Sequence, residues 1–181
     1  MKKIHLISIA ILTLFIAGCA QTASPTDQAA GTTPSASDKT QVTQAKDLCT
    51  LLSAADVSKI LGYSVNIQKG MLPDTATSSG CGYFSDTEGG VTIIYNYDNE
   101  YQTAKSQYDS AVSFQEEGKV DGITEEDPSG VGEDAYIWTN SKTTQLNAYN
   151  KNTWLTLSII DDSPDRVANA KKLANAVFGK L

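Results

Sequence analysis

Two runs of residues alternate between apolar and polar side chains, and this pattern constrains the fold more than any other feature of the sequence. Residues 91–97 place Val, Ile, Tyr and Tyr at every second position, and residues 154–160 place Leu, Leu and Ile in the same way. Successive side chains of a strand point to opposite faces, so each run predicts a strand with one buried face. Other elements must cover that face, so the chain is expected to contain a sheet.

Four further strands are predicted, and the turns between runs indicate how the strands pair. Residues 86–90 and 150–153 contain Asp, Asn and Gly between paired runs, which is typical of β-hairpins. Neighbouring strands are therefore expected to be antiparallel. The four further strands are residues 65–68, 82–85, 135–139 and 144–150.

Three helices are predicted around these strands. Ser53 followed by Asp56 is typical of a helix N-terminus, in which the two side chains and backbone amides satisfy one another. Apolar residues at three- and four-residue steps predict two more helices, the last of which begins at Ser163 and Pro164. The predicted helices span about residues 54–61, 100–117 and 163–181.

The alternation of helical and strand patterns predicts an α+β domain built in two layers. The order is one helix and three strands, a second helix and three strands, and a closing helix. We expect an antiparallel sheet of about six strands, with the second and third helices packed on one face.

Residues 1–18 have the pattern of a secretory signal. Lys2 and Lys3 precede an apolar run at 4–17, and a small residue precedes Cys19. An uncleaved helical anchor is the alternative interpretation. The tetrapeptide at 16–19, Ile-Ala-Gly-Cys, also resembles the lipobox of bacterial lipoprotein precursors. That resemblance implies cleavage before Cys19, a diacylglyceryl thioether on its sulfur, and acylation of its new amine by a fatty acid such as palmitate.

The expected mature chain is a lipid-anchored tether followed by one domain. Residues 19–46 contain Val42 as their only large aliphatic side chain, so this segment cannot bury enough apolar surface to order itself. Residues 47–181 hold all eight tyrosines and both tryptophans, enough for one core. We expect this domain to be extracytoplasmic, on the bacterial cell membrane or on the outer membrane of a cell that has two.

Charge and histidine content exclude several classes of function. Loss of Lys2 and Lys3 with the signal changes the formal net charge from −7 to −9, which disfavours nucleic acid as a partner. It equally disfavours electrostatic docking on anionic lipid, so membrane attachment depends on the lipid anchor. His5, the only histidine, lies in the predicted signal. The mature chain therefore lacks the imidazole needed for a Ser-His-Asp triad or a mixed Cys/His zinc site.

Cys49 and Cys81 are the only thiols that remain once Cys19 is lipidated. In an exported chain, a disulfide between them is preferred over two free buried thiols. Such a bridge would connect the start of the first helix to the second strand. A redox-active pair is disfavoured because the chain has no Cys-x-x-Cys and no neighbouring histidine.

Three other patterns could carry chemistry, and each has a plainer interpretation. The Gly-Val-Gly-Glu-Asp-Ala sequence at 130–135 matches a dinucleotide fingerprint, but it enters a strand and is better interpreted as a tight turn. Carboxylates cluster in several places, Glu133 and Asp161 among them, and a hydrolase pair could be built from them, although solvated surface is the simpler explanation. The tyrosines that could line a ligand pocket, or belong to the core, are Tyr95, Tyr97, Tyr101 and Tyr108.

Together, several short motifs resemble the DUF3558-like lipoproteins of bacterial envelopes. The resemblance covers nearly the whole predicted domain and implies an α+β envelope domain with bridged cysteines and no established activity. The motifs are the lipobox and its Thr/Ser/Ala/Pro-rich tether, Leu48-Cys49, Leu61-Gly62, Cys81-Gly82-Tyr83, the Gly-Val-Gly-Glu-Asp-Ala-Tyr run at 130–136, and the last helix.

Two hypotheses for function follow from the sequence. The first is a non-catalytic module that binds an envelope protein or a small ligand, with no cofactor, no metal and no catalytic residue. The second is a carboxylate-dependent hydrolase acting on envelope material. The absence of histidine from the mature chain and of any nucleophile motif favours the first.

Overall fold

The computed structural model describes residues 44–72, 74–99, 101–117 and 122–181. The predicted signal, Cys19 and most of the predicted tether lie outside these residues. Within them, seven strands form one open antiparallel sheet. The strands are β1 (Asn66–Gln68), β2 (Ser78–Phe84), β3 (Gly89–Tyr97), β4 (Thr124–Glu126), β5 (Asp134–Thr139), β6 (Thr143–Asn150) and β7 (Thr153–Asp161). Their spatial order is β1-β2-β3-β7-β6-β5-β4.

The two alternating runs form β3 and β7, the central pair of the sheet. These strands pair over nine positions, from Gly89 opposite Asp161 to Tyr97 opposite Thr153. All six strands predicted from the sequence are present, and the α+β class with an antiparallel sheet is confirmed. The seventh strand, β4, is three residues long and carries no alternating pattern, so nothing in the sequence indicated it.

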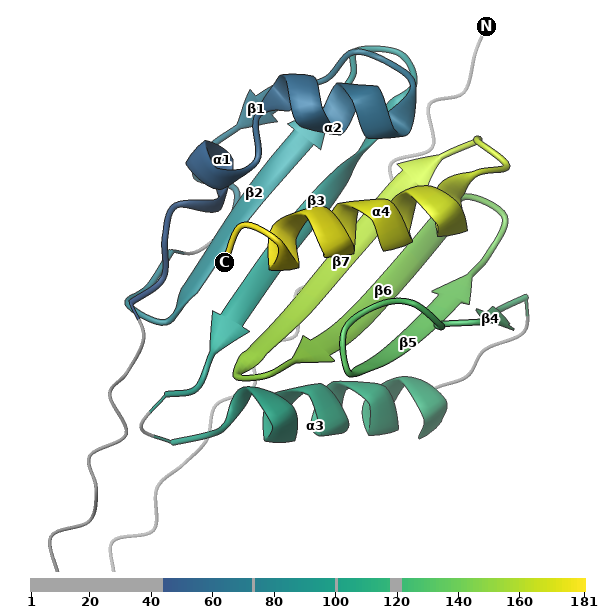
Figure 1. Cartoon of the computed structure of the whole chain (residues 1–181). Helices are drawn as coiled ribbons and strands as arrows, with labels where there is room; N and C mark the ends of the chain where they lie inside the picture. Colours follow the sequence, from purple (N-terminus) through teal and green to yellow (C-terminus); the bar gives the residue numbers. More distant parts are fainter. Residues whose placement is uncertain (1–43, 73, 100, 118–121) are drawn as a thin grey trace, which may run out of the picture. The chain divides into compact units, whose positions relative to one another are not determined.

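One face of the sheet carries the hydrophobic core. The helix α4 (Arg166–Phe178) crosses this face in front of the central strands (Figure 1). Apolar residues at every second position of β3, β6 and β7 are fully buried beneath α4 and the short N-terminal helices. The fully buried residues of these three strands in the core are Val91, Ile93, Tyr95, Leu146, Ala148, Leu155, Leu157 and Ile159.

The helix α3 (Ala104–Glu117) lies on the opposite face of the sheet, which differs from the predicted two-layer packing. Its Gln115 side chain bonds to Asn147 of β6, whose neighbours Leu146 and Ala148 point into the core on the other face. A helical stripe shows that a helix must be covered but not which face of a sheet covers it. Because α4 already occupies the core face over β6 and β7, α3 packs on the other face of the same strands.

The helix boundaries follow local capping. In α2 (Ala54–Leu61), Ser53 and Asp56 form the predicted capping box. The helix α3 begins at Ala104 rather than near residue 100, because Thr103 Oγ1 accepts a hydrogen bond from the Ser106 amide at 3.1 Å. Further along the chain, the run at 130–135 is the predicted turn, and both of its glycines have positive φ.

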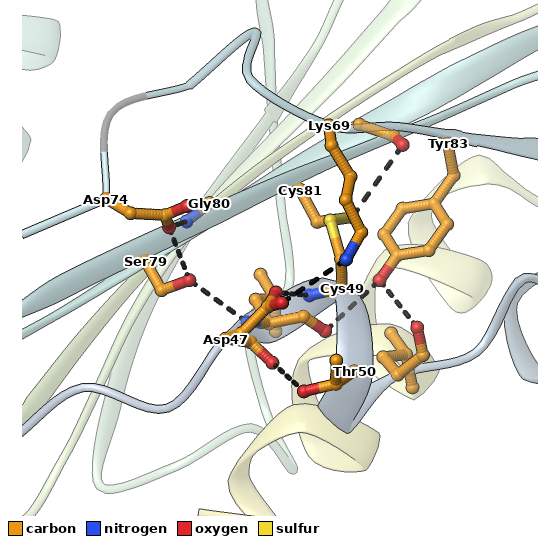
Figure 2. A network of polar contacts seen from close by, with 12 residues as sticks. Asp47, Cys49, Thr50, Lys69, Asp74, Ser79, Gly80, Cys81 and Tyr83 are labelled. Carbon is orange, nitrogen blue, oxygen red and sulfur yellow. Dashed lines mark hydrogen bonds and ion pairs between the residues drawn. A yellow bond between two sulfur atoms is a disulfide. The ribbon is translucent and has the colours of Figure 1, made fainter.

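A disulfide attaches the first helix, α1 (Leu48–Leu51), to β2 (Figure 2). Cys49 and Cys81 are bonded with their Cα atoms 5.3 Å apart, which confirms the predicted bridge. Asp47 caps α1 by accepting a hydrogen bond from the Cys49 amide at 2.8 Å. The bridge therefore holds the first described helix of the domain against the sheet.

A polar network reinforces the same connection (Figure 2). Ser79 Oγ accepts a hydrogen bond from the Leu48 amide at 3.0 Å and donates one to Asp74 at 2.7 Å. The buried Tyr83 hydroxyl donates to the Leu52 carbonyl oxygen at 2.7 Å. Burial raises the pKa of Tyr83, with smaller contributions from nearby carboxylates. The phenol therefore stays neutral and supports the turn between α1 and α2.

Candidate functional site: an aromatic groove beside α3

A groove of about 520 Å³ lies between α3 and the second face of the sheet. Three residues of α3 form one wall, and residues of β3, β5, β6 and β7 form the rest. Both tryptophans of the chain are in it. The lining residues are Ile94, Asn96, Ala111, Phe114, Gln115, Trp138, Gln145, Asn147, Trp154 and Thr156.

Strand alternation explains why these side chains reach the groove. In β7, Leu155 and Leu157 point into the core, so Trp154 and Thr156 point to the opposite face. In β5, Ile137 is buried in the core and Trp138 points the other way. The same periodicity that builds the core therefore places both tryptophans outside it.

Asn147 holds the floor of the groove together. Its side-chain oxygen accepts hydrogen bonds from Trp154 Nε1 at 3.3 Å and from Thr156 Oγ1 at 2.9 Å. Its side-chain nitrogen donates to Gln115 Oε1 at 3.0 Å. The residue is 1% exposed, so these bonds form away from bulk water. One amide thus fixes the edge of the Trp154 ring and ties it to α3.

The groove presents aromatic surface to solvent. Phe114 of α3 is 78% exposed at its rim, and the two tryptophans are only partly buried. Large exposed aromatic side chains are uncommon on a folded domain, and several together mark a binding surface. Among the described residues that line the groove, none is ionisable.

The first turns of α3 are anchored by contacts to β5 and β6. Tyr108 is buried, and its hydroxyl donates to Asp134 at 3.0 Å. Burial, followed by the bond to Asp134, raises the pKa of Tyr108. The Lys105 ammonium pairs with Asp109 and with Asp134, and it lies 5.8 Å from the centre of the Tyr149 ring. Hydrogen bonding to Asp109 raises the pKa of Lys105. Only Ala104 and Tyr108 of this helix are buried.

The sheet register separates the carboxylates considered for hydrolysis. Asp134 and Trp154 both pair with Tyr149, so they lie level across the sheet. Asp161 is seven residues further along β7, ~23 Å away at about 3.3 Å per residue. Glu133, which precedes Asp134, is therefore at the opposite end of the sheet from Asp161. A hydrolase pair needs carboxyl groups about 5 to 10 Å apart.

Asp161, Asp109 and Asp134 have structural partners. Asp161 is 6% exposed and accepts hydrogen bonds from the Tyr63 hydroxyl and the Ser163 amide, both at 3.0 Å. Burial, followed by the charge of Asp161, raises the pKa of Tyr63. A second groove of about 430 Å³ lies on the far side of α3 and contains Asp109 and Asp134. The Lys105 ammonium pairs with both of these carboxylates.

The four tyrosines named from the sequence do not share a pocket. Tyr95 is fully buried in the core, where its ring lies 5.3 Å from that of Tyr97, and its hydroxyl donates to the Lys46 carbonyl. Tyr108 is a residue of α3 and is buried against the opposite face of the sheet. Tyr101 precedes that helix and is 84% exposed.

The described residues also bear on metals and on membrane spanning. Across residues 44–72, 74–99, 101–117 and 122–181, no group of three or more His, Cys, Asp or Glu is placed to hold a metal ion. Among the same residues, no helix has the length and hydropathy needed to cross a bilayer.

Comparisons of the chain with protein-family models, with curated proteins and with solved structures found no match.

Sequence reasoning did not identify the groove, although two signals for it were present. Trp154 and Trp138 occupy the positions out of phase with the core residues of β7 and β5. The positions between core residues in β3, β6 and β7 carry amides, hydroxyls, aromatics and isoleucine instead of the charged residues usual on a solvated face. If both long helices shared one face, as the sequence predicted, these residues would lie on an uncovered face with no groove beside a helix.

Proposed function

We propose that this chain is a membrane-anchored lipoprotein of a bacterial envelope, whose extracytoplasmic domain is a non-catalytic binding module with its ligand site in the groove beside α3. The resemblance of the motifs to DUF3558-like lipoproteins supports the placement in the envelope. The observation that carries the site is that both tryptophans and the exposed Phe114 line one uncharged groove.

These aromatic residues are not needed to complete the core. Neither tryptophan belongs to the cluster of buried residues beneath α4, and Phe114 buries little of its surface. Leaving such rings in contact with water forgoes apolar burial, roughly 25 cal/mol for each Å². A ligand that covers them recovers this free energy, which is the usual basis of binding in concave aromatic sites.

The chemistry of the lining supports binding rather than catalysis. None of the described residues that form the groove can transfer a proton near neutral pH. The one hydroxyl among them, on Thr156, donates to Asn147. Nucleophilic attack needs a neighbouring base, and the lining residues supply none.

Site-specific photocrosslinking in intact cells tests the location of the site. A photoreactive residue replaces Phe114 in the full-length anchored protein, and a matched variant carries it at Lys172, an exposed position on α4 across the sheet. We expect crosslinked product from position 114 and not from position 172, beside a small molecule retained by the purified domain in native mass spectrometry. Equal crosslinking at both positions, or none at either with no retained molecule, would contradict the proposal.

A further inference from the structure

The groove contains two copies of the same small arrangement. Trp154 of β7 lies directly opposite Asn96 of β3, and Trp138 of β5 lies directly opposite Gln145 of β6. Directly opposed residues of an antiparallel pair have Cβ atoms about 5 Å apart, so each indole ring has a side-chain amide beside it. All four residues line the groove. A repeated pair of this kind suits a ligand made of repeating units.

The register also gives the separation of the two pairs. Gln145 is opposite Ser158, which is four residues along β7 from Trp154, and Trp138 lies on the second strand across. With about 3.3 Å per residue and 4.8 Å per strand, the tryptophans are ~13 Å apart along the sheet and ~10 Å across it. A ligand that contacts both rings must therefore be several units long.

The absence of charge in the lining selects among ligand chemistries. Burying a phosphate, carboxylate or ammonium without a partner is costly, and no described residue of this groove offers one. Acidic side chains lie instead in the second groove, where Asp109, Glu116 and Asp134 are found. The ligand of the aromatic groove is therefore uncharged.

The exposed rim and the amides separate a sugar from an alkyl chain. Phe114 is 78% exposed, so an alkyl chain lying here would keep much of its surface in water. A pyranose ring instead places its apolar C–H face on an aromatic ring and leaves its hydroxyls hydrated. Among the described residues, the side-chain amides of Asn96 and Gln145 have no hydrogen-bond partner. Each amide can both donate to and accept from a hydroxyl.

Resting on the proposed function, we propose that the groove binds an uncharged oligosaccharide, with one pyranose stacked on Trp154 beside Asn96 and another on Trp138 beside Gln145. Asn147 acts as a positioning residue, because it holds the edge of the Trp154 ring and does not itself need to reach the sugar.

Titration of the purified domain with neutral hexasaccharides tests the ligand class. The probes are maltohexaose, cellohexaose, mannohexaose and the hexamer of N-acetylglucosamine, followed by intrinsic tryptophan fluorescence, since both reporters of the chain are in the site. We expect a saturable change with at least one probe. Absence of a saturable change with all four at millimolar concentrations overturns the proposal.

Substitutions that leave the fold intact assign the two subsites. Calorimetric titration with the same saccharide should show about tenfold weaker binding for Asn96→Ala and for Gln145→Ala. Val112 faces the second groove. The variant Val112→Ala is therefore the matched control and should bind the saccharide like the parent protein. Unchanged affinity in both amide variants would overturn the assignment.

A further arm keeps the ligand class distinct from the proposed function. Decyl maltoside serves as a probe with an alkyl tail. If decyl maltoside binds through that tail while no hexasaccharide binds, the oligosaccharide proposal fails and a binding site beside α3 stands. If crosslinking at position 114 fails as described above, the proposed function itself fails.

Discussion

Replacing Asn147 with alanine is expected to lower stability by removing the hydrogen bonds that join β6, β7 and α3. The side chain makes bonds to Trp154, Thr156 and Gln115. A hydrogen bond contributes about 0.5 to 1.5 kcal/mol net, so three give about 1.5 to 4.5 kcal/mol. The groove lets water reach the freed partners, which places the expected loss in the lower half, about 1.5 to 3 kcal/mol.

Urea unfolding of the purified domain measures this loss. The midpoint should fall while the slope stays constant, because the surface exposed on unfolding is nearly unchanged. Thr156→Val removes one of the three bonds and should cost about 0.5 to 1.5 kcal/mol. A double-mutant cycle between Asn147→Ala and Gln115→Ala isolates the bond to α3. A loss below about 0.5 kcal/mol for Asn147→Ala would refute the reasoning, because it would mean that the three bonds add nothing over hydration.

Three further perturbations have defined outcomes. Replacing Cys49 and Cys81 by alanine opens a loop closed across a separation of 32 residues and should lower the free energy of unfolding by about 3 to 4 kcal/mol, measured in urea. Burial raises the pKa of Tyr95 from 10.0 to about 12 and also raises that of Tyr63. The stability that these buried neutral phenols contribute is therefore fully present below pH 10 and is lost as the pH rises above it, and phenolate absorbance should appear together with unfolding. Cys19→Ala should leave a precursor that takes up no labelled fatty acid, and processing of that variant would contradict lipidation.

The core face was predictable because a single periodicity specifies it. In β3 and β7, residues such as Ile93 and Leu157 recur at every second position, and each is fully buried. The capping pair Ser53 and Asp56 likewise acts over three residues and needs no tertiary context. Features determined by neighbouring residues in sequence could therefore be predicted in position and in type.

The second face could not be predicted in the same way, because it depends on long-range packing. Tyr108 belongs to the apolar stripe of α3. The stripe indicates that this side chain is covered, but not which residue its hydroxyl contacts. That residue is Asp134, 26 residues away on β5. The groove further depends on Gln115 meeting Asn147 across 32 residues, a contact that no local pattern encodes.

The topology of the sheet explains why such a groove exists. The chain leaves β3 at the centre and enters β4 at the edge, so the connection through α3 must cross β7, β6 and β5. The helix covers only part of that width, since most of its contacts are with β6 and β7 and just two of its residues are buried. Among the described residues, part of the second face is therefore left open beside the helix. The topology thus creates the groove, and the residues at the out-of-phase strand positions, Trp138, Gln145 and Trp154 among them, determine its chemistry.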